Sequence, residues 1–148
     1  MSNSIIPTEV HTLLEFRQRD RLGFAIVNTA LREFKQKAAF SWHLSVLICC
    51  DDLVEDRLPS AEEQEVLYEF EDKLASSMTA DGNALFLARV THDALREIIW
   101  RVHEPDAPNS VLKEILASKN YPREFDYRIE NDPEWRKTEW YLTNAAKD

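Results

Sequence analysis

The sequence predicts a two-layer α+β fold in which helices cover one face of an antiparallel sheet. Stretches with an apolar residue at every second position, as in strands, alternate with stretches that repeat every three or four residues, as in helices. The chain has 148 residues, of which 44% are apolar, so it is large enough for one domain with its own core. We therefore predict a single domain over residues 1–148.

Three segments have a helical pattern. Residues 60–79 begin after a proline, with Ser60 and Glu63 at the spacing of a capping box. A second helix is predicted at residues 108–119, because Asp106 and Pro108 open it and Tyr121-Pro122 closes it. A third is predicted at about residues 27–38. The apolar residues that define the first two helices are Val66, Leu67, Phe70, Leu74 and Met78, then Val111, Leu112, Ile115 and Leu116.

Strands are predicted between these helices, at residues 41–50, 84–91, 94–103 and 124–130, with one or two more at 11–18 and 21–27. Residues 84–91 are an almost continuous apolar run, which is typical of a central strand. The short connection His92-Asp93 predicts a hairpin. From residue 41 the order is therefore β, α, β, β, α, β, which is the ferredoxin-like or split βαβ order.

This order divides the chain into three parts. We predict a ferredoxin-like core at residues 41–131 with two helices on one face of the sheet, and an N-terminal β/α extension at residues 1–40. The aromatic C-terminal segment, residues 132–148, is predicted either to seal the edge of the core with Trp135 and Trp140 or to form a subunit contact of a homodimer. The predicted core residues are Phe70, Leu74, Phe86, Ile98, Trp100, Leu112, Ile115 and Phe125.

Charge and cysteine content narrow the function. The formal net charge of −9 argues against direct nucleic-acid binding and against attachment to an anionic membrane. No apolar run is long enough to span a bilayer, and the first residues lack the basic start and apolar stretch of a secretory signal. Because the only cysteines are the adjacent Cys49 and Cys50, we expect no disulfide framework and a cytoplasmic location.

The acidic residues are concentrated in one segment. Residues 51–72 hold ten acids and one base, so this segment carries a net −9, equal to that of the whole chain. One interpretation is a docking surface for a basic protein partner, because complementary charges speed encounter and select partners. The other is a solvated helix face whose early acids favour the helix dipole. The predicted partner-binding residues are Asp51, Asp52, Glu55, Asp56, Glu62, Glu65 and Glu69.

Metal and catalytic sites are weakly indicated. Asp51, Asp52, Glu55 and Asp56 are ligands of the type that Ca²⁺ or Mg²⁺ prefers, but residues 51–59 have no glycine for a sharp turn and no EF-hand pattern. His43 and Cys49 are predicted on one strand face, without the further ligands that zinc needs, and the cysteines are predicted to be structural. P-loop, dinucleotide-binding and hydrolase signatures are absent, so we expect no cofactor, no metal and no assigned catalytic residue.

Several motifs resemble those of a bacterial DUF family of small domains of unknown function. They are LPSAEE at 58–63, FEDKL at 70–74, FSWHL at 40–44, FDYRIENDPEW at 125–135, and Arg89-Val90-Thr91 followed by Arg96. The family is similar in fold to RraB-type regulators, which are acidic ferredoxin-like proteins that inhibit a bacterial endoribonuclease by binding it. The resemblance implies a binding role and no catalytic residues.

Two hypotheses follow. The first is an interaction module that regulates or inhibits a basic protein, such as an RNA-processing enzyme. The second is a small-ligand binder or enzyme that uses the open face of the sheet. A pocket formed jointly by His43, Cys49 and Arg89 would favour the second hypothesis.

Overall fold

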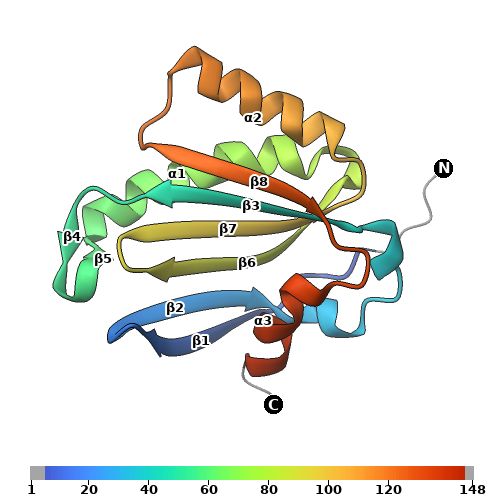
Figure 1. Cartoon of the computed structure of the whole chain (residues 1–148), viewed down its shortest axis with the longest axis horizontal. Helices are drawn as coiled ribbons and strands as arrows, with labels where there is room; N and C mark the ends of the chain where they lie inside the picture. Colours follow the sequence, from blue (N-terminus) through green and yellow to red (C-terminus); the bar gives the residue numbers. More distant parts are fainter. Residues whose placement is uncertain (1–5, 146–148) are drawn as a thin grey trace.

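The computed structural model describes residues 6–145 (Figure 1). Its main sheet has six antiparallel strands in the order β1-β2-β6-β7-β3-β8, and β4 and β5 form a separate two-stranded ladder. The strands are β1 (His11–Gln18), β2 (Arg21–Asn28), β3 (Trp42–Cys49), β4 (Leu53–Val54), β5 (Leu58–Pro59), β6 (Ala84–His92), β7 (Leu95–Val102) and β8 (Phe125–Asn131). The helices are α1 (Ala61–Met78), α2 (Asp106–Ser118) and α3 (Glu139–Asn144). The predicted α+β class and antiparallel sheet are confirmed.

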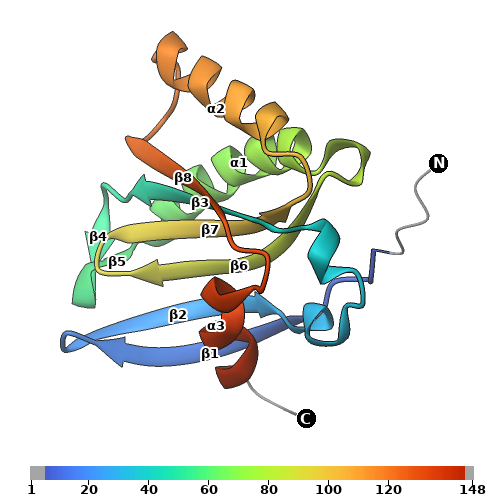
Figure 2. The same ribbon diagram turned by 45° about the vertical axis from the view of Figure 1, so that its right-hand side comes forward.

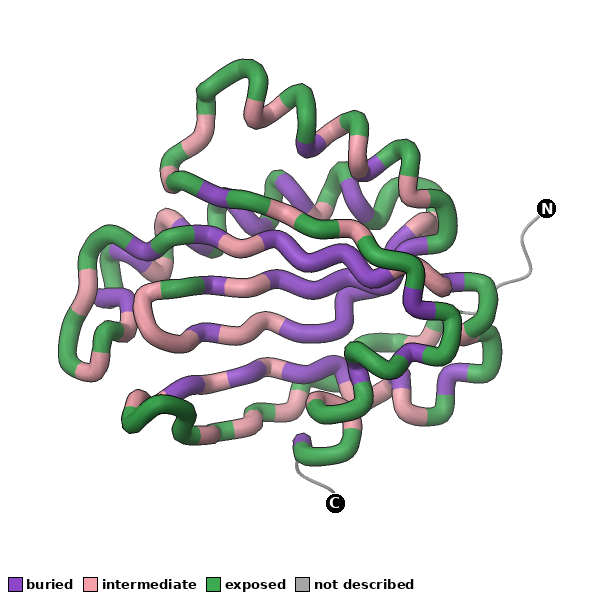
Figure 3. The backbone as a smooth tube through the Cα atoms, in the orientation of Figure 1, coloured by how far each residue is buried: buried purple, intermediate pink, exposed green. Residues whose placement is uncertain are grey.

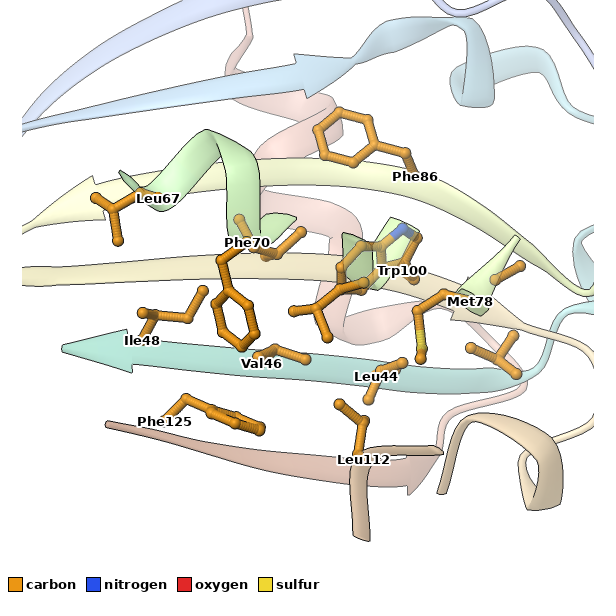
Figure 4. Packing of buried hydrophobic residues seen from close by; sticks show 14 of the residues in the cluster. Leu44, Val46, Ile48, Leu67, Phe70, Met78, Phe86, Trp100, Leu112 and Phe125 are labelled. Atoms are coloured by element: carbon orange, nitrogen blue, oxygen red, sulfur yellow. The ribbon is translucent and has the colours of Figure 1, made fainter. Parts of the chain in front are cut away.

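The first hydrophobic core lies between the sheet and the helices α1 and α2 (Figures 1 and 2). Side chains at every second position of β3 point into it, and Phe70 of α1 packs edge-on against Phe125 of β8 (Figure 4). All eight predicted core residues belong to this cluster, with Ile115 partly buried at its margin. Burial of this apolar surface is the main stabilising contribution of the helix-on-sheet packing.

A second core lies on the opposite face of the sheet. Leu31, Phe34 and Phe40, from the two short 3₁₀ turns η1 (Thr29–Glu33) and η2 (Lys37–Ala39) and their flanks, pack there with Trp135 and Ala145 of the C-terminal segment. The N-terminal third therefore does two things: β1 and β2 extend the sheet, and the turns after β2 cover part of its second face. Because both faces are covered at its centre, β6 is buried over its first five residues (Figure 3).

Strand β6 contains an irregularity that changes which side chains share a face. The pairing with β7 shifts between Phe86 and Ala88, so one extra residue is accommodated there. Before the shift, Phe86 faces α1, and after it Arg89 and Thr91 do so, opposite Ile98 and Arg96 of β7. A strict period of two along this strand would place Arg89 on the wrong face.

Two tight hairpins join β1 to β2 and β6 to β7. Arg19 and Asp20 connect β1 to β2, and Asp93 and Ala94 connect β6 to β7; all four residues have positive φ angles, between 48° and 66°. Two consecutive left-handed residues are the geometry of a type I′ turn, which matches the twist of the flanking strands. The predicted hairpin is confirmed, but its turn is Asp93-Ala94, one residue later than the predicted connection His92-Asp93.

The helix predicted at residues 27–38 is wrong. Strand β2 continues to Asn28, and only the two 3₁₀ turns follow. The buried Asn28 accounts for the end of the strand, because its side chain accepts a hydrogen bond from the Val10 amide (3.0 Å) and donates one to the carbonyl oxygen of Phe86 (3.0 Å). Leu31 and Phe34 are three residues apart, a spacing that fits a 3₁₀ turn as well as an α-helix.

Candidate functional site

A groove runs over the face of the sheet that α1 and α2 leave uncovered. It has a volume of about 600 Å³ and adjoins a shallower hollow of about 410 Å³; the two share Leu47, Glu97, Lys137 and Tyr141. The first volume is within the range of small-ligand sites, roughly 300–1,000 Å³. The groove residues are Phe16, Arg17, Gln18, Leu47, Val90, His92, Leu95, Glu97, Lys137, Trp140 and Tyr141.

Aromatic rings form one wall of the groove. Phe16 of β1 lies 5.7 Å from the ring of Trp140 and 5.5 Å from that of His92, and Trp140 lies 5.3 Å from Tyr141, all between ring centroids. Phe16 occupies its position because the residue paired with it on β2 is Gly23. A Cβ atom at Gly23 would lie 2.4 Å from the Phe16 ring, so only glycine allows the ring to lie across the strand.

A carboxylate lies between the groove and the neighbouring hollow. Glu97 accepts a hydrogen bond from the hydroxyl of Ser45 on β3 (2.5 Å), and no base forms an ion pair with it among the described residues. Burial, together with the charge of Glu97, raises the pKa of Tyr141 to about 12, so this hydroxyl stays protonated at neutral pH. Lys137 is held at the margin by an ion pair with Glu130 (3.1 Å). This arrangement can bind a cation or a hydrogen-bond donor at Glu97.

His43 lies at the far end of the hollow and is bound to a buried arginine. Its Nδ1 accepts a hydrogen bond from Arg101 (3.2 Å), which is fully buried and also donates to Asp132 (2.9 Å). Burial and the charge of Arg101 lower the pKa of His43 to about 4. His43 is therefore neutral at physiological pH and serves as a structural hydrogen-bond acceptor.

The predicted acidic docking segment divides into two groups. In the first group the acids contact other parts of the fold. Glu63 is almost fully buried, and hydrogen bonds from Arg123 (2.6 and 2.7 Å) and from the Asp51 amide (2.8 Å) lower its pKa to about 2. The other members are Asp51 (3.4 Å from Arg123), Asp52 (2.5 Å from the Ser60 hydroxyl), Asp56 (2.7 Å from the Leu22 amide) and Glu71 (2.7 Å from Arg89).

The second group remains solvent-exposed. Glu62, Glu65, Glu69 and Asp72 follow one another at helical spacing along α1, and Glu55 precedes the helix; none forms an ion pair with another described residue. We call the four helical acids the α1 acidic stripe. None of the four lines the groove, which lies on the opposite face of the sheet.

The pocket considered at His43, Cys49 and Arg89 does not form. His43 lines the hollow on the open face, Cys49 is exposed, and Arg89 lies on the α1 side, bound to Glu71. Cys50 is buried in the first core, and burial raises the pKa of its thiol to about 11, which fits a structural role. Within residues 6–145, no three His, Cys, Asp or Glu side chains are grouped closely enough to hold a metal ion.

Sequence reasoning missed Glu97 and the aromatic wall. One signal was present: Glu97 interrupts an apolar strand, between Leu95 and Ile98. The wall was not predictable, because Phe16 and Trp140 are 124 positions apart and meet only through the strand order. Trp135 does seal the second core, as one of the two predictions for the C-terminal segment states, whereas Trp140 is 48% exposed.

The fold and the site define an α+β protein with a ligand-sized groove on the face of its sheet opposite the two long helices. The model of the family of unknown function DUF695 matches residues 19–142, so the chain belongs to this family. The predicted membership of a DUF family is thus confirmed. Neither the curated proteins nor the solved structures that were compared with the chain include a match. Of the helices within residues 6–145, none combines the length and the apolar character needed to cross a membrane.

Proposed function

We propose that the chain is a binding protein whose open-face groove accepts a small amine with a flat apolar body. The observation that carries this proposal is Glu97, a carboxylate in an aromatic-walled groove whose hydrogen-bond partner is the neutral hydroxyl of Ser45. A carboxylate in such surroundings gains most from a cationic donor, because charge-assisted hydrogen bonds are about twice as strong as neutral ones.

The aromatic wall supports the same class of ligand. The faces of Phe16, Trp140 and Tyr141 offer stacking surface for a ring, and aromatic faces also attract cations. Lys137 forms its ion pair with Glu130 and not with Glu97.

A matched pair of probes tests the proposal. Tyramine and 3-(4-hydroxyphenyl)propionate share a ring and differ in the sign of their charge. In isothermal titration calorimetry we expect tyramine to bind and the acid not to bind. Glu97→Gln should weaken tyramine binding by about tenfold or more, the loss of one charge-assisted contact. Glu15→Gln, an equal charge change at an exposed residue of β1, should leave the affinity unchanged.

Four outcomes would contradict the proposal. They are equal binding of the two probes, an undiminished tyramine affinity of Glu97→Gln, no heat of binding from tyramine at millimolar concentration, and binding of the acid alone.

A second candidate function is the docking of a basic protein partner on the α1 acidic stripe. The specific observation in its favour is that Glu62, Glu65, Glu69 and Asp72 share one exposed helix face without ion-pair partners among the described residues. The regulatory role, with an RNA-processing enzyme as target, rests on the resemblance to RraB-type regulators. Of the seven residues predicted for this docking, Glu55, Glu62, Glu65 and Glu69 are the ones that we retain.

The association rate distinguishes this function from a solvated helix face. With a partner retrieved from lysate at low salt, the triple variant Glu62→Gln, Glu65→Gln, Glu69→Gln should associate more slowly, and with a flatter dependence on salt. The control neutralises three exposed acids elsewhere, Glu15, Glu33 and Glu124. Equal rates for the two variants would show that only net charge matters, and would remove the stripe as a docking surface.

We also propose that β3, α1, β6, β7, α2 and β8 form a ferredoxin-like core. The strand order β6-β7-β3-β8 and the position of both helices on one face support this arrangement. A solved relative with the same connections would test it.

A further inference from the structure

Arg96 of β7 is a buried cation without a carboxylate partner. Its side chain lies on the α1 side of the sheet, and the residue is 1% exposed. Its Nη2 donates to the side-chain oxygen of Gln64, whereas Nε and Nη1 have no hydrogen-bond partner. These two atoms are two of the three buried side-chain nitrogen or oxygen atoms without a partner in the described part of the chain.

Arg96 is one of the residues that line a cavity of about 290 Å³. The cavity is lined by residues of the β4–β5 ladder, the first half of α1 and strands β2, β6 and β7. Figure 1 shows where these elements lie in the fold. Two of its lining residues are arginines and none is acidic. The lining residues are Phe24, Ile26, Val54, Leu58, Pro59, Gln64, Tyr68, Arg89, Thr91 and Arg96. It is therefore a local basic site in a strongly acidic chain, on the face opposite the groove.

The surroundings compensate the charge of Arg96 only in part. The ring of Tyr68 lies 5.2 Å from its guanidinium carbon, which is a cation–π contact. The nearby carboxylate of Glu71 already accepts hydrogen bonds from Nε (2.8 Å) and Nη2 (2.7 Å) of Arg89. Arginine stays protonated in proteins, so burial cannot be relieved by loss of a proton, and a buried charge without a counter-ion is costly. An anion in the cavity would supply the acceptor that Nε and Nη1 of Arg96 lack.

We infer that this cavity binds a small organic carboxylate, whose charged group accepts hydrogen bonds from Arg96 and whose short apolar body packs against Phe24, Ile26 and Leu58. A single unpaired cation matches the single charge of a carboxylate. A phosphate dianion would need a second free cation, and Arg89 is paired with Glu71. The apolar lining from β2 and the β4–β5 ladder matches an alkyl or aryl body and not a second charged group.

Hexanoate, hexanol, hexylamine and inorganic phosphate are the probes that test this inference on the full chain. In calorimetry we expect hexanoate alone to bind. Arg96→Met, which keeps an unbranched apolar stem and removes the charge, should weaken hexanoate binding by about tenfold or more. Arg128→Met, an equal charge change at an exposed residue of β8, and Glu97→Gln in the groove should leave it unchanged.

A spectroscopic measurement on the unmodified protein keeps the test independent of how well Arg96→Met folds. The Nε–H signal of Arg96, assigned in a ¹H–¹⁵N spectrum by its loss in the variant or through its own spin system, should shift on addition of hexanoate and not of hexanol. An unmoved signal, binding of hexanol as tight as that of hexanoate, or binding of phosphate alone would overturn the inference. Failure of the tyramine experiment would leave it unaffected, because the two sites share no residue.

Discussion

Single residues show how this fold accommodates buried charge. Arg101 is completely buried, yet its donors are taken up by the Asp132 carboxylate (2.9 Å), the Asp132 carbonyl oxygen (2.6 Å) and the Phe40 carbonyl oxygen (3.2 Å). Its guanidinium also lies 4.6 Å from the centre of the Trp135 ring. Arg101 thus joins β7 to the C-terminal segment, whereas Arg96 on the same strand, facing the other way, lacks such partners. Two buried arginines on one strand therefore differ in whether their charge is neutralised within the fold.

His43 gives a prediction for the pH dependence of stability. In the folded protein its pKa is about 4, against 6.5 for an unperturbed histidine, so between these values the unfolded chain binds a proton that the folded chain does not. Stability should therefore fall as the pH is lowered from 6.5 to 4, by about 3 kcal/mol in total, since each pKa unit corresponds to about 1.4 kcal/mol.

Urea unfolding at pH 7, 5.5 and 4.5 measures this loss. His43→Asn keeps an acceptor for Arg101 and cannot be protonated, so its stability should change much less over this range. The buried carboxylates Glu63 and Asp132 have lowered pKa values, and their contribution is lost only at still lower pH. Equal pH slopes for the two proteins would contradict the buried neutral state of His43.

Secondary-structure elements begin and end where local chemistry requires it. Helix α1 begins after Ser60, whose hydroxyl accepts a hydrogen bond from the Glu63 amide (3.1 Å), as the capping-box pattern predicts. The reciprocal half of the box is absent: the Glu63 side chain binds Arg123 and the Asp51 amide instead. The glutamate of the capping-box pattern thus makes a long-range contact in place of the local one.

The turn between β6 and β7 gives a prediction at this scale. Ala94 has a φ of +66°, a left-handed conformation that costs an L-residue with a Cβ about 1–2 kcal/mol and costs glycine little. After allowance for the greater freedom of glycine in the unfolded chain, Ala94→Gly should stabilise the protein by about 0.5–1 kcal/mol.

The same substitution within a helix is the control. Ala75→Gly in α1 should destabilise the protein by about 1 kcal/mol, because glycine is a poor helix former. Thermal unfolding of both variants shows whether the two substitutions change the stability in opposite directions. A lower melting midpoint for Ala94→Gly would mean that contacts of the alanine methyl group outweigh the backbone strain.

The whole molecule is organised around the six-stranded sheet, which has a hydrophobic core on each face. The first core is closed by the two long helices, and the second by the 3₁₀ turns after β2 and by the C-terminal segment. Trp135 joins the two segments that cover the second core. Its Nε1 donates to the carbonyl oxygens of Lys37 (2.9 Å) and Phe40 (3.1 Å), and its ring packs near Phe34. The groove is the part of this second face that the coverings leave open.

The two C-terminal tryptophans should therefore differ in their effect on stability. Trp135 is 3% exposed, so Trp135→Ala should cost about 3–5 kcal/mol, as other large deletions in cores do. Trp140→Ala, at a residue 48% exposed, should cost about 1 kcal/mol or less, and should instead weaken tyramine binding in the groove. Chemical denaturation of both variants measures the difference, and similar costs would argue that α3 and not Trp135 closes the second core.

Much of the element order was predictable, because each element has a local cause. The alternation in β3, the helical repeat in α1 and the hairpin between β6 and β7 depend on residues a few positions apart, and all three predictions are confirmed. The helix at 27–38 failed because a spacing of three residues does not distinguish a 3₁₀ turn from an α-helix. The position of the acidic segment was predictable from composition. Which of its acids lack ion-pair partners was not.

By itself the sequence determined the α+β class, the helix-facing core and the excess of negative charge, since these follow from periodicity and composition. Only the tertiary structure decided which charges find partners. Glu63 meets Arg123 across 60 positions, Glu71 takes Arg89, and Arg96 and Glu97, adjacent on β7, point to opposite faces. The physical reason is that pairing across a sheet depends on strand order and register, which the irregularity in β6 shifts by one residue. The groove and the cavity at Arg96 both consist of side chains that this long-range order brings together.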